Sequence, residues 1–152
     1  VASGSRVYSA DEADVIVYVI GEVPYAEWLG DFRSGDFNDK FITSAAYEGP
    51  QFGSTSQYLT QINNWKLEGK KVAVVLITGR PLPITSLIEA SDAFVVAWLP
   101  GSEGAGVADV LFGDVKPTGK LPHTWPKDAT QIPINEGDGK EGLYPYGYGL
   151  TY

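Results

Sequence analysis

One run of residues sets the architecture of this chain: Asp14-Val15-Ile16-Val17-Tyr18-Val19-Ile20, with Gly21 directly after it. The run is almost entirely β-branched and apolar, which is typical of a parallel strand covered on both faces by helices. In open α/β sheets, ligands bind beyond the carboxyl ends of such strands. In this chain that position is followed by Glu22, Glu27 and Asp31. We therefore expect the functional residues to lie on this acidic loop.

The rest of the chain repeats the alternation of apolar runs and helical patterns. Two further buried strands are predicted at residues 72–77 and 93–98, and helices at 55–67, at 84–90 and after Glu103. This order predicts an α/β fold, a three-layer sandwich with a mainly parallel sheet. Doubly wound sheets usually have about five or six strands, and the sequence contains no methionine. We therefore expect the chain to lack the first βα units of its domain and to be a processed product, an excised domain or one part of a longer polypeptide.

The composition excludes several classes of function. The net charge is −8 and the pI is about 4.5, which argues against a nucleic-acid surface because phosphate binding needs clustered Lys and Arg. Without cysteine and with a single histidine, the chain cannot form disulfides, thiolate sites or a multi-histidine metal centre. We expect neither a metal nor a cofactor. No apolar run approaches about 18 residues, so no membrane span is predicted.

Two glycine-rich segments resemble phosphate-binding loops only superficially. Residues 113–120 have five residues between the glycines instead of four, and they follow a helix instead of opening one. Residues 100–106 do open a helix, but they lack the dinucleotide fingerprint, and Glu103 would repel an anion there. We therefore interpret the first segment as a turn and the second as a helix start.

The C-terminal part, from Asp114, is rich in proline, glycine and tyrosine, and we expect it to pack over the domain as an irregular tail. Its tyrosines alternate with proline and glycine, so they would serve either as a platform for stacking a sugar or as a clamp that holds the tail on the core. We favour the clamp. His123 lies in the same region and is expected to be a surface or interface residue.

The acidic loop is the remaining candidate for chemistry. A hydrolase that uses paired carboxylates needs one protonated group to give a proton to the leaving oxygen and one ionised group to attack or to activate water. Glu22 and Glu27 are such a pair on one loop. Taken alone, the simpler interpretation is a solvated surface loop, because most carboxylates near strand ends have no special role.

Five motifs in one order change that interpretation: GEVPYAE at 21–27, TGRPL at 78–82, AWLPGSEGAGVADVLFG at 97–113, TGKLP at 118–122 and YGYGL at 146–150. Together they resemble the second catalytic domain of the family 3 glycoside hydrolases, the β-glucosidase and exo-β-glucanase family. The resemblance covers residues 14–152. Each motif alone is weak, but five in register are highly specific.

The resemblance implies that residues 1–152 form the C-terminal α/β sandwich domain of a retaining, exo-acting β-glucosidase. In this family an (α/β)8-type barrel domain supplies an aspartate nucleophile, and in exo-glucanase-like members the sandwich supplies an acid/base glutamate, which Glu27 matches here. Glu22 and Asp31 match flanking loop positions, where we expect them to support the loop or the substrate. A retaining mechanism places the two catalytic carboxyl groups about 5 to 5.5 Å apart.

The barrel is absent from this sequence, so we expect the chain alone to be inactive. Its expected partner is the upstream barrel domain, either covalently joined or as a separate chain. The expected substrates are terminal β-D-glucosyl residues of oligosaccharides or β-glucans, and the resemblance favours an extracellular or periplasmic location. Two alternatives remain open: a non-catalytic α/β module that binds carbohydrate or protein, and a flavodoxin-like binder, which rests on fold analogy alone.

Overall fold

The computed structural model describes residues 9–21 and 55–151. Each predicted strand and helix in this part of the chain is confirmed, with ends that differ by about one residue. In chain order the elements are the 3₁₀ helix η1 (Ala10–Glu12), β1 (Val15–Gly21), α1 (Thr55–Leu67), β2 (Lys71–Ile77), α2 (Thr85–Ala90), β3 (Ala93–Trp98), α3 (Gly104–Leu111) and the 3₁₀ helix η2 (Ala129–Gln131).

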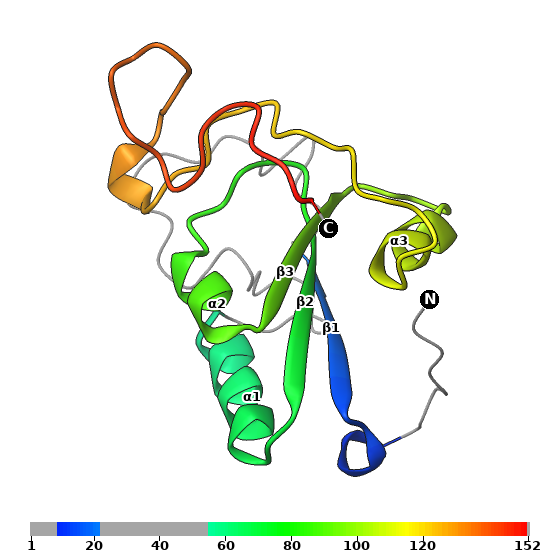
Figure 1. Cartoon of the computed structure of the whole chain (residues 1–152). Coiled ribbons are helices and arrows are strands. Elements are labelled where there is room, and N and C mark those ends of the chain that lie inside the picture. Colours follow the sequence, from blue (N-terminus) through cyan, green and yellow to red (C-terminus); the bar gives the residue numbers. More distant parts are fainter. Residues whose placement is uncertain (1–8, 22–54, 152) are drawn as a thin grey trace.

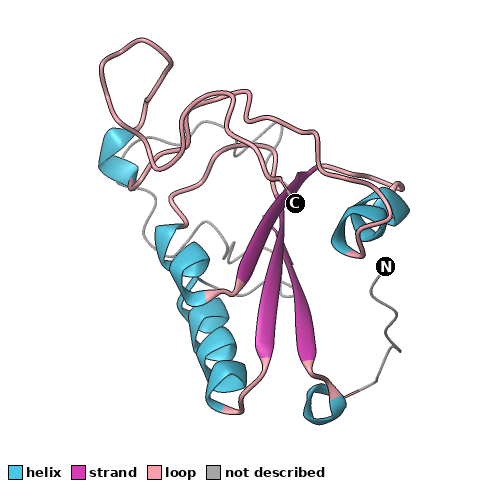
Figure 2. Cartoon of the chain, in the orientation of Figure 1, coloured by secondary structure: helices cyan, strands magenta, loops and turns pink. Residues whose placement is uncertain are grey.

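The three strands form one parallel sheet in the order β1-β2-β3. Helices α1 and α2 lie on one side of this sheet and α3 on the other, which gives three layers (Figures 1 and 2). The predicted α/β sandwich with a parallel sheet is therefore confirmed. All three strands run in the same direction, so their carboxyl ends meet at one edge of the sheet.

The hydrophobic core lies between the sheet and the helices α1 and α2. On β2, Val72, Val74 and Leu76 point to this face, and all are at most 1% exposed. Tyr58 and Ile62, one helical turn apart on α1, are buried against the same face. The side chains on one face of α1 and the alternate side chains of β2 thus pack against one another in one core.

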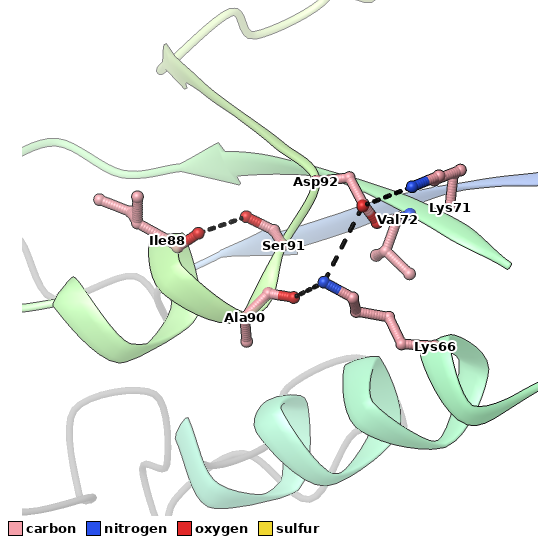
Figure 3. Close-up of polar contacts among 7 residues, drawn as sticks. All are labelled: Lys66, Lys71, Val72, Ile88, Ala90, Ser91 and Asp92. Carbon is pink, nitrogen blue, oxygen red and sulfur yellow. Dashed lines mark hydrogen bonds and ion pairs between the residues drawn. The ribbon is translucent and has the colours of Figure 1, made fainter. Parts of the chain in front are cut away.

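The amino ends of β2 and β3 are joined by a polar cluster around Asp92 (Figure 3). The Asp92 carboxylate accepts a hydrogen bond from the Val72 amide at 2.9 Å and from Lys71 Nζ at 3.2 Å. Lys66, in the last turn of α1, lies 3.9 Å from the same carboxylate and donates to the Ala90 carbonyl at 3.0 Å. This cluster fixes the end of the sheet opposite to the candidate site.

One feature of the sheet differs from the sequence-based prediction. The composition of β1 predicts a strand covered by helices on both faces, but Val15, Val17 and Val19 are 56%, 47% and 59% exposed. Helices α1 and α2 cover the opposite face, which carries Ile20 at 2% exposure. Among the described residues, α3 is the helix on the valine side, and it does not bury these three side chains.

Candidate active-site edge

The candidate site is the edge of the sheet where the three strands end. The residues predicted to act there, Glu22, Glu27 and Asp31, lie outside the described residues, so their catalytic and supporting roles stay predictions. The structure describes the segments next to this loop at the same edge of the sheet. These segments are the end of β1 at Gly21, the turn after β2 and the turn after β3.

Gly21 is the last residue of β1 and directly precedes Glu22. A side chain at this position would place its Cβ 3.2 Å from the Ile77 carbonyl oxygen and 3.3 Å from the Ile77 Cβ. These distances are tighter than most real Cβ contacts. Glycine is therefore the residue that lets β1 and β2 approach closely at the point where the acidic loop starts.

The turn after β2 is closed by the side chain of a buried threonine. Thr78 is 1% exposed, and its hydroxyl donates to the Arg80 carbonyl at 2.9 Å and accepts from the Arg80 amide at 3.3 Å. The Thr78 amide donates to the Trp98 carbonyl at 3.1 Å. One threonine thus ties the turn after β2 to the end of β3, in the way that Ser and Thr hydroxyls commonly stabilise turns.

The end of β3 carries a local irregularity. The register between β2 and β3 passes from Leu76–Val96 to Ile77–Trp98, so Ala97 is an extra residue in β3. Trp98 has a φ of 54°, in the left-handed region that a bulky residue rarely adopts. Such a conformation costs on the order of 1–3 kcal/mol and persists only where the surroundings enforce it. Bulges of this kind re-aim side chains next to active sites.

Trp125 holds this edge from the C-terminal segment. It is 1% exposed, its ring centroid lies 5.9 Å from that of Trp98, and its Nε1 donates to the Leu82 carbonyl at 2.6 Å. It also pairs with the tail, because its amide donates to the Tyr144 carbonyl at 2.8 Å. One residue thereby connects the end of β3, the segment after β2 and the tail.

The tail acts as the predicted clamp. The Leu121 amide donates to the Tyr148 carbonyl at 2.7 Å, and the Gly147 amide donates to the Leu121 carbonyl at 2.9 Å. The rings of Tyr144 and Tyr148 stack with centroids 4.4 Å apart. Burial, with a smaller contribution from Tyr148, raises the pKa of the Tyr144 phenol above its ordinary value.

An apolar groove of about 460 Å³ runs beside β3, between α3 and the segment 115–121. Phe94 and Val96 of β3, Val107 of α3, and Trp125 and Tyr148 line it. The sequence does not show this groove, because its walls come from segments that are far apart along the chain. Its walls are mainly apolar, and Glu103, Lys116, Thr118 and Lys120 also line it.

His123 is exposed, as predicted for a surface residue. Within residues 9–21 and 55–151, no group of three or more His, Asp and Glu side chains is arranged to hold a metal ion. No helix in the same part of the chain is long and apolar enough to cross a membrane.

Comparison with known proteins gives consistent results. Residues 2–152 match the protein-family model described as the glycosyl hydrolase family 3 C-terminal domain. The chain is 36% identical over 169 aligned positions to the periplasmic β-glucosidase of Salmonella typhimurium, covering 96% of this chain and 20% of that protein. It is 42% identical over 97 positions to a xylan 1,4-β-xylosidase of Xylanibacter ruminicola, and this match covers 57% of this chain and 11% of the xylosidase.

The solved structures agree with the sequence relatives. The exo-1,3/1,4-β-glucanase of a Pseudoalteromonas species superposes with a TM-score of 0.74 at 40% identity, covering 99% of this chain and 18% of that one. The chain thus spans about a fifth of the length of this glucanase and of the Salmonella β-glucosidase.

Proposed function

The chain belongs to the glycosyl hydrolase family 3 C-terminal domain family, and from this premise we propose that it supplies Glu27 as the general acid/base of a retaining, exo-acting β-glucosidase. The observation that carries the proposal is the position of β1. This strand lies in a parallel sheet and ends at Gly21, so the loop with Glu22 and Glu27 begins at the edge where α/β sheets bind their ligands.

The described residues support this role by making the edge rigid. The close contact at Gly21, the Thr78 turn and the Trp98–Trp125 packing fix the ends of all three strands relative to one another. A catalytic carboxyl group must be held within a fraction of an ångström of its productive position. Precise placement of Glu27 requires that its loop begin at a fixed point, and the contacts at the strand ends supply such a point.

In the proposed mechanism, the Glu27 carboxylic acid gives its proton to the glycosidic oxygen while a carboxylate of the barrel domain attacks the anomeric carbon. The sugar is then covalently attached to the barrel, and the leaving group departs with its oxygen protonated. The Glu27 carboxylate next takes a proton from water, which displaces the sugar with net retention of configuration. Burial of Glu27 against the barrel would raise its pKa, as a general acid requires.

The same proposal sets the domain organisation and the partners. Residues 1–152 act as the C-terminal sandwich domain of a larger enzyme, and the catalytic site is complete only when a barrel domain is docked on it. The Salmonella β-glucosidase and the Pseudoalteromonas glucanase are each about five times as long as the matched part, which supports a multidomain enzyme. Glu22 and Asp31 would either hold the loop in place or bind the substrate. The periplasmic relative supports a location outside the cytoplasmic membrane.

Terminal β-D-glucosyl residues are the proposed substrate. The β-glucosidase and β-glucanase relatives cover 96% and 99% of this chain, whereas the xylosidase covers 57% at a higher identity of 42%. A β-xyloside is therefore the second candidate. Matched aryl β-glucosides and β-xylosides, assayed on the same preparation, distinguish the two by their kcat/KM.

The test uses a chimera in which residues 1–152 replace the matching segment of the Pseudoalteromonas exo-1,3/1,4-β-glucanase, hereafter the chimera. Glu27→Gln removes the proton donor while keeping the shape of the side chain. We expect kcat/KM for an unactivated disaccharide to fall by about 10²- to 10⁴-fold. For a dinitrophenyl glucoside, whose leaving group needs no proton, we expect a much smaller loss in the glycosylation step.

Glu89→Gln is the matched control, because Glu89 is an exposed glutamate on α2. We expect it to leave both activities unchanged. Equal losses on the two substrates for Glu27→Gln, or no loss on either, would sink the acid/base assignment and favour a non-catalytic binding module.

A further inference from the structure

We propose that Arg80 is a positioning residue of the glycosidase reaction, whose guanidinium group binds the Glu22 carboxylate and holds the acidic loop in place. This role rests on the proposed function, because it serves the loop that carries Glu27. Arg80 itself would not touch the substrate. It follows the end of β2 as Glu22 follows the end of β1, and both strands end at the candidate edge (Figure 1).

The backbone of Arg80 is held at a fixed place beside the start of the acidic loop. Gly21 at the end of β1 pairs with Ile77 at the end of β2. Glu22 is one residue beyond this pair, and Arg80 is three residues beyond it. The hydroxyl of the buried Thr78 bonds both the carbonyl and the amide of Arg80. Because neighbouring strands are about 4.8 Å apart, Glu22 and Arg80 start from adjacent positions of one rigid edge.

The charge of Arg80 makes a carboxylate its expected partner. It is the one basic residue in the turns 78–84 and 99–103, which follow β2 and β3. The residue is half-buried, and a guanidinium group that loses part of its water is stabilised by a bound anion. Its planar fork also matches the two oxygens of a carboxylate, which the ammonium group of lysine does not.

Among the carboxylates of the acidic loop, Glu22 fits this role best. It is bonded directly to Gly21, whose close contact with Ile77 fixes the point where the loop starts. A guanidinium group beside Glu27 would lower the pKa of that carboxyl group, which is the opposite of what a general acid requires. Asp31 is ten residues beyond Gly21, so the end of β1 constrains its position far less.

Arg80→Gln in the chimera tests the role through substrate dependence and pH dependence. Misplacing the acid should lower kcat/KM for an unactivated disaccharide by about 10- to 100-fold. The dinitrophenyl glucoside, whose leaving group needs no proton, should be affected far less. Without the guanidinium group the Glu22 charge near Glu27 is uncompensated, so the alkaline limb of the kcat/KM profile should move to higher pH. Arg80→Lys keeps the charge without the fork, so it should recover part of the activity and the wild-type limb.

A double-mutant cycle in the chimera identifies the partner of Arg80. The combination of Arg80→Gln with Glu22→Gln should be no less active than Arg80→Gln alone, and its alkaline limb should return toward the wild-type position, because both charges are then absent. Losses that multiply would overturn the pairing, and so would coupling of Arg80 to Asp31→Asn instead. Lys70→Gln is the matched control. It removes a positive charge beside the start of β2, where Lys70 Nζ donates to the Asp11 carbonyl at 2.8 Å, and should leave activity and limb unchanged.

The melting temperature of the same variants separates the pairing from the role of Glu27. Coupling of Arg80 and Glu22 in melting temperature, with no effect of Glu27→Gln on activity, would support the pairing while the acid/base assignment fails. If Glu27→Gln acts as expected but Arg80→Gln lowers both activities equally and leaves the pH limb in place, Arg80 has only a structural role and the proposal is overturned. If Arg80→Gln does not fold, the cycle of Arg80→Lys with Glu22→Gln gives the same comparison.

Discussion

Replacing Trp125 with phenylalanine should destabilise the domain strongly, because this residue joins three segments at the candidate edge. The substitution removes the Nε1 donor and leaves the Leu82 carbonyl, on a residue that is 2% exposed, without this partner. An unsatisfied buried acceptor costs about 1–3 kcal/mol. The loss of two buried ring carbons adds roughly 1.5 kcal/mol, at about 0.8 kcal/mol for each. We therefore expect a loss of about 2.5–4.5 kcal/mol.

A loss of this size is a large part of the roughly 5–15 kcal/mol that typically stabilises a domain. It should be measured by urea unfolding of the 152-residue chain, followed by far-ultraviolet circular dichroism because the substitution removes a fluorophore. His123→Ala, two residues away and exposed, is the matched control, and its effect should stay within about 0.5 kcal/mol. A loss below about 1 kcal/mol for Trp125→Phe, with an unchanged denaturant slope, would refute the reasoning that the indole ties the edge together.

Two further predictions concern the tail and the opposite end of the sheet. Gly142→Ala should lower the melting temperature, because the new Cβ would lie 2.5 Å from the Trp125 carbonyl oxygen, whereas Gly119→Ala meets no atom within 4 Å and should be neutral; equal melting curves for the two variants would contradict this. The pKa of Asp92 is lowered, chiefly by the hydrogen bond from the Val72 amide, below its ordinary value of 3.8. The stability that the ionised Asp92 contributes is therefore fully present above about pH 5 and is lost as the pH falls from about 4 through the lowered pKa. Asp92→Asn should unfold at lower urea than wild type at pH 7, and this difference should shrink below pH 4; a constant difference would show that the carboxylate charge is not responsible.

The strands and helices could be predicted because their signals are local. The runs that became β1, β2 and β3 are short, apolar and bounded by polar or glycine residues, and buried parallel strands have that composition. On α1, Tyr58 and Ile62 fall on one face at helical spacing, and both are buried. The helical pattern repeats within one helical turn and the strand pattern within two residues, so both can be recognised from a short stretch of sequence.

The features at the candidate edge could not be predicted in the same way. Trp98 has a left-handed conformation and packs against Trp125, which is 27 positions further along the chain, so its surroundings cannot be read from the local sequence. The groove beside β3 likewise arises where distant segments meet. The exposed face of β1 could not be predicted, because an apolar composition indicates that a strand is usually buried but not which segment covers it. Glu22, Glu27 and Asp31 lie outside the described residues, so the catalytic assignment rests on the sequence resemblance and the family.

The central claim, that Glu27 is the acid/base, is tested most directly by azide rescue of the Glu27→Ala chimera on dinitrophenyl β-D-glucoside. Without Glu27, water lacks its general base and the glycosyl–enzyme intermediate should accumulate, whereas the azide anion attacks without giving up a proton. We predict that azide raises the turnover rate and that the product is β-glucosyl azide. A turnover rate independent of azide, or a product with the α configuration, would contradict the assignment.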